Sequence, residues 1–327
     1  MKSPVTPLFD TKFDTNRLLF DSIHPGKSRN IPFRLFVIFL LLTFSINIWA
    51  SGSKISNSEL ANSEKGTLWK VEKANQKSSY LLGTVHVSDP RIINFRPELN
   101  NVLAKVSSIS IEAKLDMEMQ MAVAMKMFSP GSNLEADIGP LYFKKITTEM
   151  LKYNMTPDMV RQLKPWAVMM TLSVPADNDP AAFMDALIYK YALEKGKDVY
   201  GLETLDEQLS IFDSMTQENQ ITLLKQTVDE LSKRDEQLEE MLLIYLDSDL
   251  GRLADINESH LKKMDNEILE NLMIKLIDGR NKIMLGRMNP RLLEGNALIA
   301  VGALHLVGEK GLVNLLRQKG YTLSPVY

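Results

Sequence analysis

Two short segments near opposite ends of the folded part share one pattern: an apolar strand, a glycine, two residues and a histidine. Residues 81–87 read LLGTVHV and residues 300–306 read AVGALHL. The chain has only four histidines and 16 glycines, so a chance match is on the order of 1%. A glycine at a strand end permits close backbone approach, and the histidine then projects at the carboxyl edge of the sheet, where open α/β sheets bind ligands. The pair predicts two imidazoles at one metal or substrate site.

Strand-like segments occur at both ends of the chain, with helical patterns between them. The expected strands are residues 67–72, 79–82, 106–111, 198–202, 296–301 and, at an edge, 321–326. Prolines divide much of residues 157–180 into short helices, and residues 206–249, which lack proline and glycine, predict a pair of helices. This order predicts an α/β (α+β) fold with a helical insertion between two sheet-forming halves.

Composition excludes several classes of chemistry. Without cysteine there is no disulfide, iron–sulfur cluster, thiolate zinc site or cysteine nucleophile. The net charge is −3, from 38 basic and 41 acidic residues, and no basic run is present, so no nucleic-acid partner is expected. The motifs of phosphate-binding loops, serine hydrolases, dinucleotide folds and helical zinc proteases are also missing.

The N-terminus has the organisation of an export signal. Three basic residues (Lys27, Arg29 and Arg34) precede the apolar run at residues 35–44, and Ala50 offers a cleavage site. We expect residues 1–50 to be an extension and signal peptide, 51–65 a linker and 66–327 the folded domain, exported to the periplasm or cell surface. An uncleaved anchor is the alternative, although ten apolar residues fall short of the roughly 20 that span a bilayer. The N-terminal segment would be the only membrane contact.

One acidic residue could complete a metal site with the two histidines. Glu112 ends a strand-like segment 26 residues after His86, and we expect that strand to lie beside the first histidine's strand. His86, His305 and Glu112 would then form a set of two imidazoles and one carboxylate, which binds zinc and other catalytic divalent metals. Such a metal lowers the pKa of bound water. Manganese, cobalt and zinc all suit these ligands, and a solvated or capping role for Glu112 is the alternative.

Two more residues are candidates for the chemistry. Glu203 ends the strand at residues 199–202 and could transfer a proton. Arg280 lies at a helix start or junction, 25 residues before His305, and could stabilise the negative charge of a tetrahedral intermediate. The alternative for Arg280 is a structural ion pair with Asp278 or Glu112.

In this order, the motifs resemble the TraB/GumN family, which includes pheromone-shutdown proteins and the Tiki metalloproteases. The resemblance covers roughly residues 66–326 and rests on Tyr80–His86, Ile111–Glu112, Gly201–Thr204, Arg280–Asn281, Val301–Gly308, Gly311–Val313 and Gly320–Tyr321. It implies a fold of two related halves, similar to erythromycin-esterase-like and ChaN-like proteins. It also implies an active centre of His86, Glu112, Arg280 and His305, with Glu203 in support, as in divalent-metal-dependent peptidases.

Two functional hypotheses follow. The first is an exported metal-dependent hydrolase that acts on a peptide or small-molecule substrate. The second is a non-catalytic binding or sequestering protein for a peptide, small molecule, haem or metal. In the second, the methionine-rich segment at residues 117–127 would be a recognition lid, whereas core packing is the alternative use of such a segment. The apolar stripes of residues 206–249 fit either core packing or a homodimer interface.

Overall fold

The computed structural model describes residues 65–327, except residues 115–116 and 264–266. The predicted signal run at residues 35–44 and nearly all of the linker lie outside the described residues. No helix in the described part of the chain is long and apolar enough to cross a membrane.

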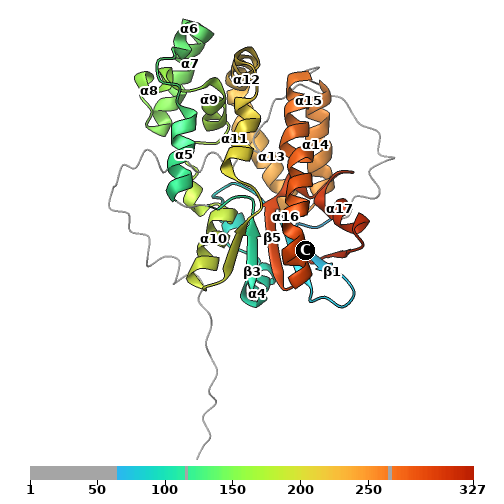
Figure 1. Ribbon diagram of the computed structural model, residues 1–327. Coiled ribbons are helices and arrows are strands. Elements are labelled where there is room, and N and C mark those ends of the chain that lie inside the picture. Colours follow the sequence, from blue (N-terminus) through green and yellow to red (C-terminus); the bar gives the residue numbers. More distant parts are fainter. Residues whose placement is uncertain (1–64, 115–116, 264–266) are drawn as a thin grey trace, which may run out of the picture. The chain divides into compact units, whose positions relative to one another are not determined.

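The described residues form one six-stranded mixed sheet covered by helices, which confirms the predicted α/β fold class (Figure 1). The strands are β1 (Leu68–Glu72), β2 (Ser79–Thr84), β3 (Ser108–Ile111), β4 (Asp198–Gly201), β5 (Ala297–Gly302) and β6 (Thr322–Pro325). Their order is β4-β3-β5-β2-β1-β6. The four strands from β4 to β2 are parallel, whereas β1 is antiparallel to both β2 and β6. The predicted edge position of the last strand is correct.

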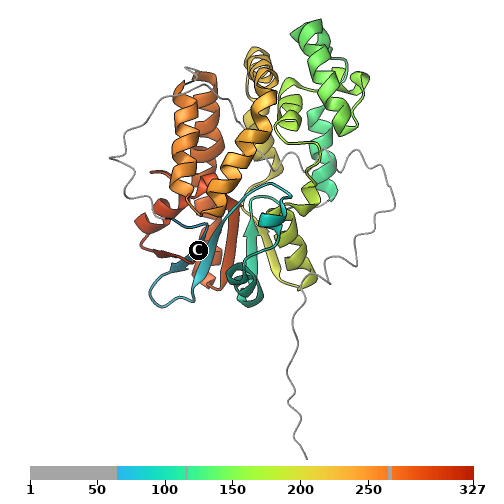
Figure 2. The same ribbon diagram turned by 180° about the vertical axis from the view of Figure 1, so that it is seen from behind.

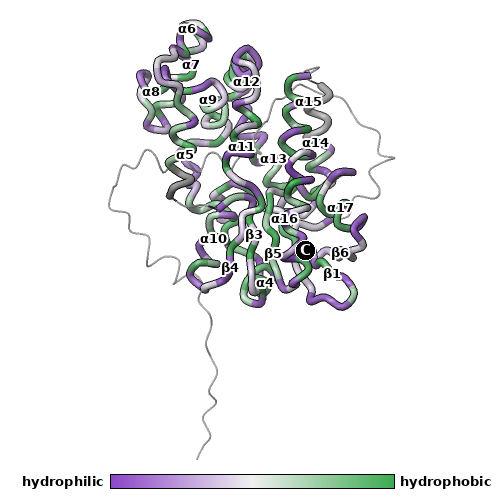
Figure 3. Tube along the Cα trace, in the orientation of Figure 1, coloured by the Kyte–Doolittle hydropathy of each residue, from purple (hydrophilic) through white to green (hydrophobic). Residues whose placement is uncertain are grey.

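The two glycine-histidine strands are direct neighbours. In the parallel β2–β5 pair, Gly83 lies opposite Val301 and Thr84 opposite Gly302, so both motifs leave the sheet at the same edge. The expectation that the Glu112 strand lies beside the first histidine's strand was wrong, because β5 lies between β3 and β2. All six residues of β5 are buried, and Figure 3 shows this strand as hydrophobic. Such a strand suits the interior of a parallel sheet, so β5, near the end of the chain, returns to the middle of the sheet.

A turn joins β1 to β2, and the other connections between strands contain helices. Between β2 and β4 lie α3 (Pro90–Ile93), α4 (Pro97–Lys105), α5 (Met117–Met127), α6 (Leu134–Ile138), α7 (Pro140–Met150), η3 (Leu151–Tyr153), α8 (Pro157–Arg161), α9 (Pro165–Leu172), η4 (Pro180–Ala182) and α10 (Met184–Glu194). From β4 onward lie α11 (Leu205–Asp213), α12 (Gln217–Glu230), η5 (Leu231–Lys233), α13 (Arg234–Leu246), α14 (Leu250–Lys263), α15 (Glu267–Met273), η6 (Ile274–Gly279), α16 (Arg280–Glu294), η7 (Ala303–His305) and α17 (Leu312–Gln318).

The helices extend beyond the sheet on one side. Figures 1 and 2 show α5–α9 with α12, and α14 with α15, beyond the same end of the sheet. The predicted helix pair at residues 206–249 is instead three α-helices (α11, α12 and α13) with a short 3-10 turn, because turns interrupt the pattern without proline or glycine. Their apolar faces are buried within the chain, as at Phe212, Leu223 and Leu242.

The methionine-rich helix α5 has two different faces. Val123 and Met127 are buried, whereas Met121 and Met125 are 63% and 76% exposed. The helix packs against α11. One face therefore packs in the core as expected for a methionine-rich segment, and the other presents adaptable apolar side chains to solvent.

Candidate active site

The carboxyl ends of four parallel strands bring the predicted residues together at one edge. His86 follows β2, Glu112 follows β3, Glu203 follows β4 and His305 lies in η7 directly after β5. The Glu203 backbone N–H donates to the Glu112 carbonyl oxygen at 2.7 Å, which extends the β3–β4 pairing to these carboxylates. This edge is where open α/β sheets place their ligands.

The fifth residue, Arg280, reaches the edge from a helix. It begins α16, directly after the six-residue π-helix η6. A π-helical segment widens the turn and is frequent at functional sites. Here it immediately precedes the residue whose guanidinium lies in the site.

Arg280 lies between two buried carboxylates. Its Nη2 binds Oε2 of Glu112, and its Nε and Nη2 bind Glu203 at 2.9 and 2.7 Å. Gln208 of α11 donates to Oε2 of Glu203 at 3.2 Å. Asp278, the other carboxylate considered for Arg280, pairs with Lys310 instead. The Nη1 atom of Arg280 takes part in none of these bonds.

The electrostatics of the two carboxylates differ. Burial acts to raise the pKa of Glu112, but Arg280 and His305 outweigh it and lower that pKa to about 2. Burial raises the pKa of Glu203 above its ordinary value, although the Arg280 guanidinium opposes the shift. Glu112 is therefore the permanently ionised partner, and Glu203 is the one better suited to exchange a proton.

A capping box fixes the chain just after Glu203. Thr204 accepts a hydrogen bond from the backbone N–H of Glu207, and the Glu207 carboxylate accepts from the Thr204 backbone N–H at 2.8 Å. Arg287 of α16 then binds Glu207 at 2.6 Å. These contacts hold the start of α11 and thus the position of the Glu203 side chain.

Asn281 sets the tautomer of His305. Its side-chain amide N–H groups donate to two backbone carbonyls, those of Lys310 at 2.8 Å and His305 at 3.2 Å. Its Oδ1 must then accept, and His305 Nδ1 lies 2.7 Å away. His305 Nδ1 therefore carries the proton, and the lone pair of Nε2 is free. Burial and the nearby Arg280 lower the pKa of His305 to about 3, so the ring is neutral at pH 7.

His86 has a carboxylate neighbour of its own. Its Nε2 lies 2.9 Å from Oδ2 of Asp185, a buried residue in the first turn of α10. The other oxygen of Asp185 accepts from the Thr84 hydroxyl at 2.9 Å. Burial acts to lower the pKa of His86, but the Asp185 carboxylate raises it above its ordinary value overall.

The donor chemistry of the edge suits a divalent cation. Both ring nitrogens of His86, Nε2 of His305 and Oδ2 of Asp185 are buried without a hydrogen-bond partner, and unprotonated imidazole nitrogens and carboxylate oxygens are ligands of such ions. His305 Nε2 lies 3.7 Å from Oε1 of Glu112. Among the described residues, however, no three His, Asp or Glu side chains are already grouped closely enough to hold an ion.

The candidate site is closed to solvent, and none of its five residues lines the larger cleft of the described chain. The five predicted site residues are all buried, with Glu203 the most exposed at 5%. A cleft of about 530 Å³, with both polar and apolar lining residues, lies between the α11–α12 junction and α15. It is lined by Ser214, Met215, Thr216, Asn219, Glu267, Ile268, Asn271, Leu272 and Lys275. On one wall, Ser214 directly follows α11, the helix that carries Gln208. On the other wall, Lys275 lies in η6, which directly precedes Arg280.

Sequence reasoning missed three residues at this edge: Asp185, Gln208 and Asn281. Asp185 is the kind of acidic residue expected in any first helical turn, and Gln208 lies in a long amphipathic pattern. Asn281 was quoted only as part of the Arg280–Asn281 motif. Its place directly after a candidate residue, at the start of a helix, was the one signal that could have found it.

Fold and site together define an α/β protein with two G-x-x-H strands and a Glu–Arg–Glu cluster at one sheet edge. The profile of the TraB/PrgY/gumN family matches residues 67–325, and the chain belongs to this family. The resemblance seen in the sequence motifs is thereby confirmed.

Two relatives show how far this likeness extends. A protein named Metalloprotease TIKI homolog, from Amphimedon queenslandica, is 22% identical over 349 residues, covering 90% of this chain and 67% of the relative. An uncharacterized protein of Treponema pallidum (strain Nichols) is 22% identical over 200 residues, covering 58% of this chain. The match spans 59% of the Treponema relative's length. No solved structure matches the chain, so likeness to erythromycin-esterase-like or ChaN-like folds stays a prediction.

Proposed function

We propose that the chain is an exported, divalent-metal-dependent hydrolase that cleaves peptide bonds. The observation that carries the proposal is the meeting of both G-x-x-H histidines with Glu112, Arg280 and Glu203 at the carboxyl edge of the parallel strands. The name of the Amphimedon relative supports the reaction class. The signal-like segment before residue 51 supports export.

His86, His305 and Glu112 are the residues that would hold the cation. His305 suits this role because the ring is neutral and its Nε2 lone pair is free. A divalent metal bound there supplies an activated water at neutral pH and polarises the scissile carbonyl. Manganese, cobalt and zinc all accept such ligands.

Arg280 and Glu203 would serve the chemistry as a pair. Two nitrogens of the guanidinium fix the carboxylates, and its Nη1 remains to donate to the oxyanion of a tetrahedral intermediate. Glu203, whose pKa is raised by burial, can accept a proton and pass it to the leaving amine. Because these groups are buried, a peptide reaches them only after the covering side chains move aside.

The test compares wild-type chain with the double variant H86A/H305A and the control H260A, which changes a histidine outside both G-x-x-H motifs. Metal content is measured by mass spectrometry after incubation with Mn²⁺, Co²⁺ or Zn²⁺, and turnover with a peptide library. We expect about one metal per chain and hydrolysis in wild type and H260A, and neither in the double variant. Hydrolysis retained by H86A/H305A would overturn the proposal.

The closed site favours one second candidate, a protein that sequesters a peptide or small molecule without cleaving it. Complete burial of a polar cluster suits retention of a ligand as well as exclusion of water. This candidate predicts saturable binding that survives EDTA, with no product formed. Binding that disappears with the metal would exclude it.

A further inference from the structure

Asp185 and His86 meet without forming a hydrogen bond. Oδ2 of Asp185 lies 2.9 Å from Nε2 of His86, and both side chains are almost completely buried. Neither atom has a hydrogen-bond partner. Two ligand atoms about 2.1 Å from one cation lie roughly 3.0–3.4 Å apart and point at the cation rather than at each other. The distance of 2.9 Å between Oδ2 of Asp185 and Nε2 of His86 is close to this spacing.

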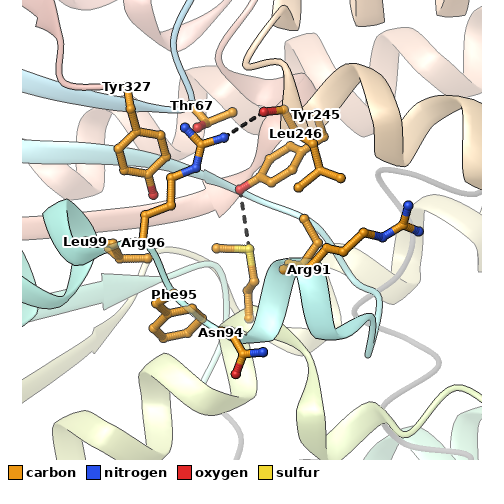
Figure 4. Close-up of a pocket in the computed structure, with 11 residues that line it drawn as sticks. Thr67, Arg91, Asn94, Phe95, Arg96, Leu99, Tyr245, Leu246 and Tyr327 are labelled. Atoms are coloured by element: carbon orange, nitrogen blue, oxygen red, sulfur yellow. Dashed lines mark hydrogen bonds between the residues drawn. The ribbon is translucent and has the colours of Figure 1, made fainter. Parts of the chain in front are cut away.

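A hydrogen bond to Oδ1 holds the Asp185 side chain in place and leaves its Oδ2 without a partner. Thr84, the last residue of β2, donates to Oδ1 of Asp185 at 2.9 Å. The Tyr245 hydroxyl donates to the Gly83 carbonyl oxygen at 2.7 Å and lies 3.4 Å from the sulfur of Met184. Tyr245 and Met184 line a small pocket of about 30 Å³, and Figure 4 shows Tyr245 in this pocket. Tyr245 thereby joins the end of β2 to the start of α10.

Glu112 is occupied by other partners. Its Oε1 accepts from the Gly302 backbone N–H at 2.6 Å, and its Oε2 binds Arg280. Asp185 instead has an oxygen with no partner beside the histidine. Of these two carboxylates, Asp185 is the one with an oxygen that no hydrogen bond occupies, so it is the more available to a cation.

We propose that Asp185 is a ligand of the cation, paired with His86, and that it supplies the carboxylate oxygen assigned above to Glu112. This inference rests on the proposed metal-dependent function. It gives Glu112 a different role, namely to hold Arg280 and the second glycine-histidine turn in place.

The experiment measures metal binding rather than activity. Full-length chain is stripped with EDTA and titrated with Mn²⁺ by calorimetry and with Co²⁺ by visible absorption. The variants are D185N and E112Q. D185N preserves the shape of the side chain and keeps an oxygen that accepts the hydrogen bond from Thr84. The matched control is D179N, an exposed aspartate six residues before Asp185. We expect D185N to weaken Mn²⁺ binding by more than the roughly 10–100-fold of an indirect effect, and to change the Co²⁺ spectrum.

The outcomes separate this inference from the function on which it rests. D179N should bind Mn²⁺ within roughly 10-fold of wild type. E112Q alters a residue that positions the second glycine-histidine turn, so it should weaken Mn²⁺ binding by no more than roughly 10–100-fold and leave the Co²⁺ spectrum unchanged. T84V, which keeps the carboxylate, should weaken Mn²⁺ binding less than D185N does. If D185N binds as wild type does, or weakens binding only about 10–100-fold with an unchanged Co²⁺ spectrum, Asp185 is not a ligand. If the wild type binds no metal at all, the proposed function itself fails. Far-UV circular dichroism verifies that each variant is folded.

Discussion

The backbone N–H of Gly302 donates a hydrogen bond to Oε1 of Glu112, with the two atoms 2.6 Å apart. This bond joins the carboxylate after β3 to the glycine that ends β5, although 190 residues separate them in the chain. The other oxygen of Glu112 binds Arg280. The acidic residue, the second glycine-histidine turn and the guanidinium therefore form one connected unit.

Removing Arg280 should destabilise the fold strongly. R280A leaves Glu112 and Glu203 buried without a counter-charge, and breaking a buried ion pair costs about 3–5 kcal/mol. The measurement is urea unfolding followed by circular dichroism. The control R287A removes a half-exposed ion pair with Glu207 and should cost about 1 kcal/mol or less. Adding E203Q to R280A should recover part of the loss, and no recovery would contradict this explanation.

Asn281 should control which nitrogen of His305 is available. N281A removes the acceptor that faces Nδ1 at 2.7 Å, so the ring loses its fixed tautomer. We expect Mn²⁺ affinity to fall by roughly 10–100-fold, as for other residues that orient a ligand. Nitrogen-15 NMR of the imidazole should show a proton on Nδ1 in wild type and a mixture in N281A. A wild-type ring protonated on Nε2 would refute the assignment.

The two glycine-histidine motifs pack closely against each other at Gly83, which leaves little room for a side chain. A Cβ built there would lie 3.0 Å from the Ala303 Cα and 3.1 Å from the Leu306 side chain. G83A should therefore lower the free energy of unfolding by about 1–3 kcal/mol. Gly286, exposed in α16 with no atom within 4 Å of a built Cβ, is the matched control. G286A should instead stabilise the chain by about 0.5–1 kcal/mol, so equal effects of the two variants would contradict the packing argument.

The capping box before α11 should make stability depend on acid pH. Arg287 and the Thr204 N–H lower the pKa of Glu207 to about 2. A depressed folded-state pKa contributes stability that is present above the unfolded pKa of about 4.3 and lost as pH falls toward 2. E207Q loses the partly exposed ion pair with Arg287, so it should lie about 0.5–1 kcal/mol below wild type at pH 7 and converge with it near pH 2–3. Urea unfolding at several pH values tests this, with E309Q as an exposed control.

The sequence motifs alone were enough to place the chain in its family and to pair the two histidines. This succeeded because a strand followed by G-x-x-H is a local pattern, and parallel neighbours end at the same edge whatever their order. The sequence also predicted that Glu112 and Glu203 each lie at the end of a strand, as the structure shows. The fold class, with a helix-rich middle and strands at both ends, followed from hydrophobic periodicity.

Only the tertiary structure decided the strand order and the partners of each site residue. β5 inserts between β2 and β3 because the last third of the chain returns to the centre of the sheet, and no local pattern encodes that return. The Thr84–Asp185 bond spans 101 residues, and the Gln208–Glu112 contact spans 96. Such contacts depend on how α10 and α11 pack, since a polar residue on a helix has the same local pattern whether it faces solvent or a buried site.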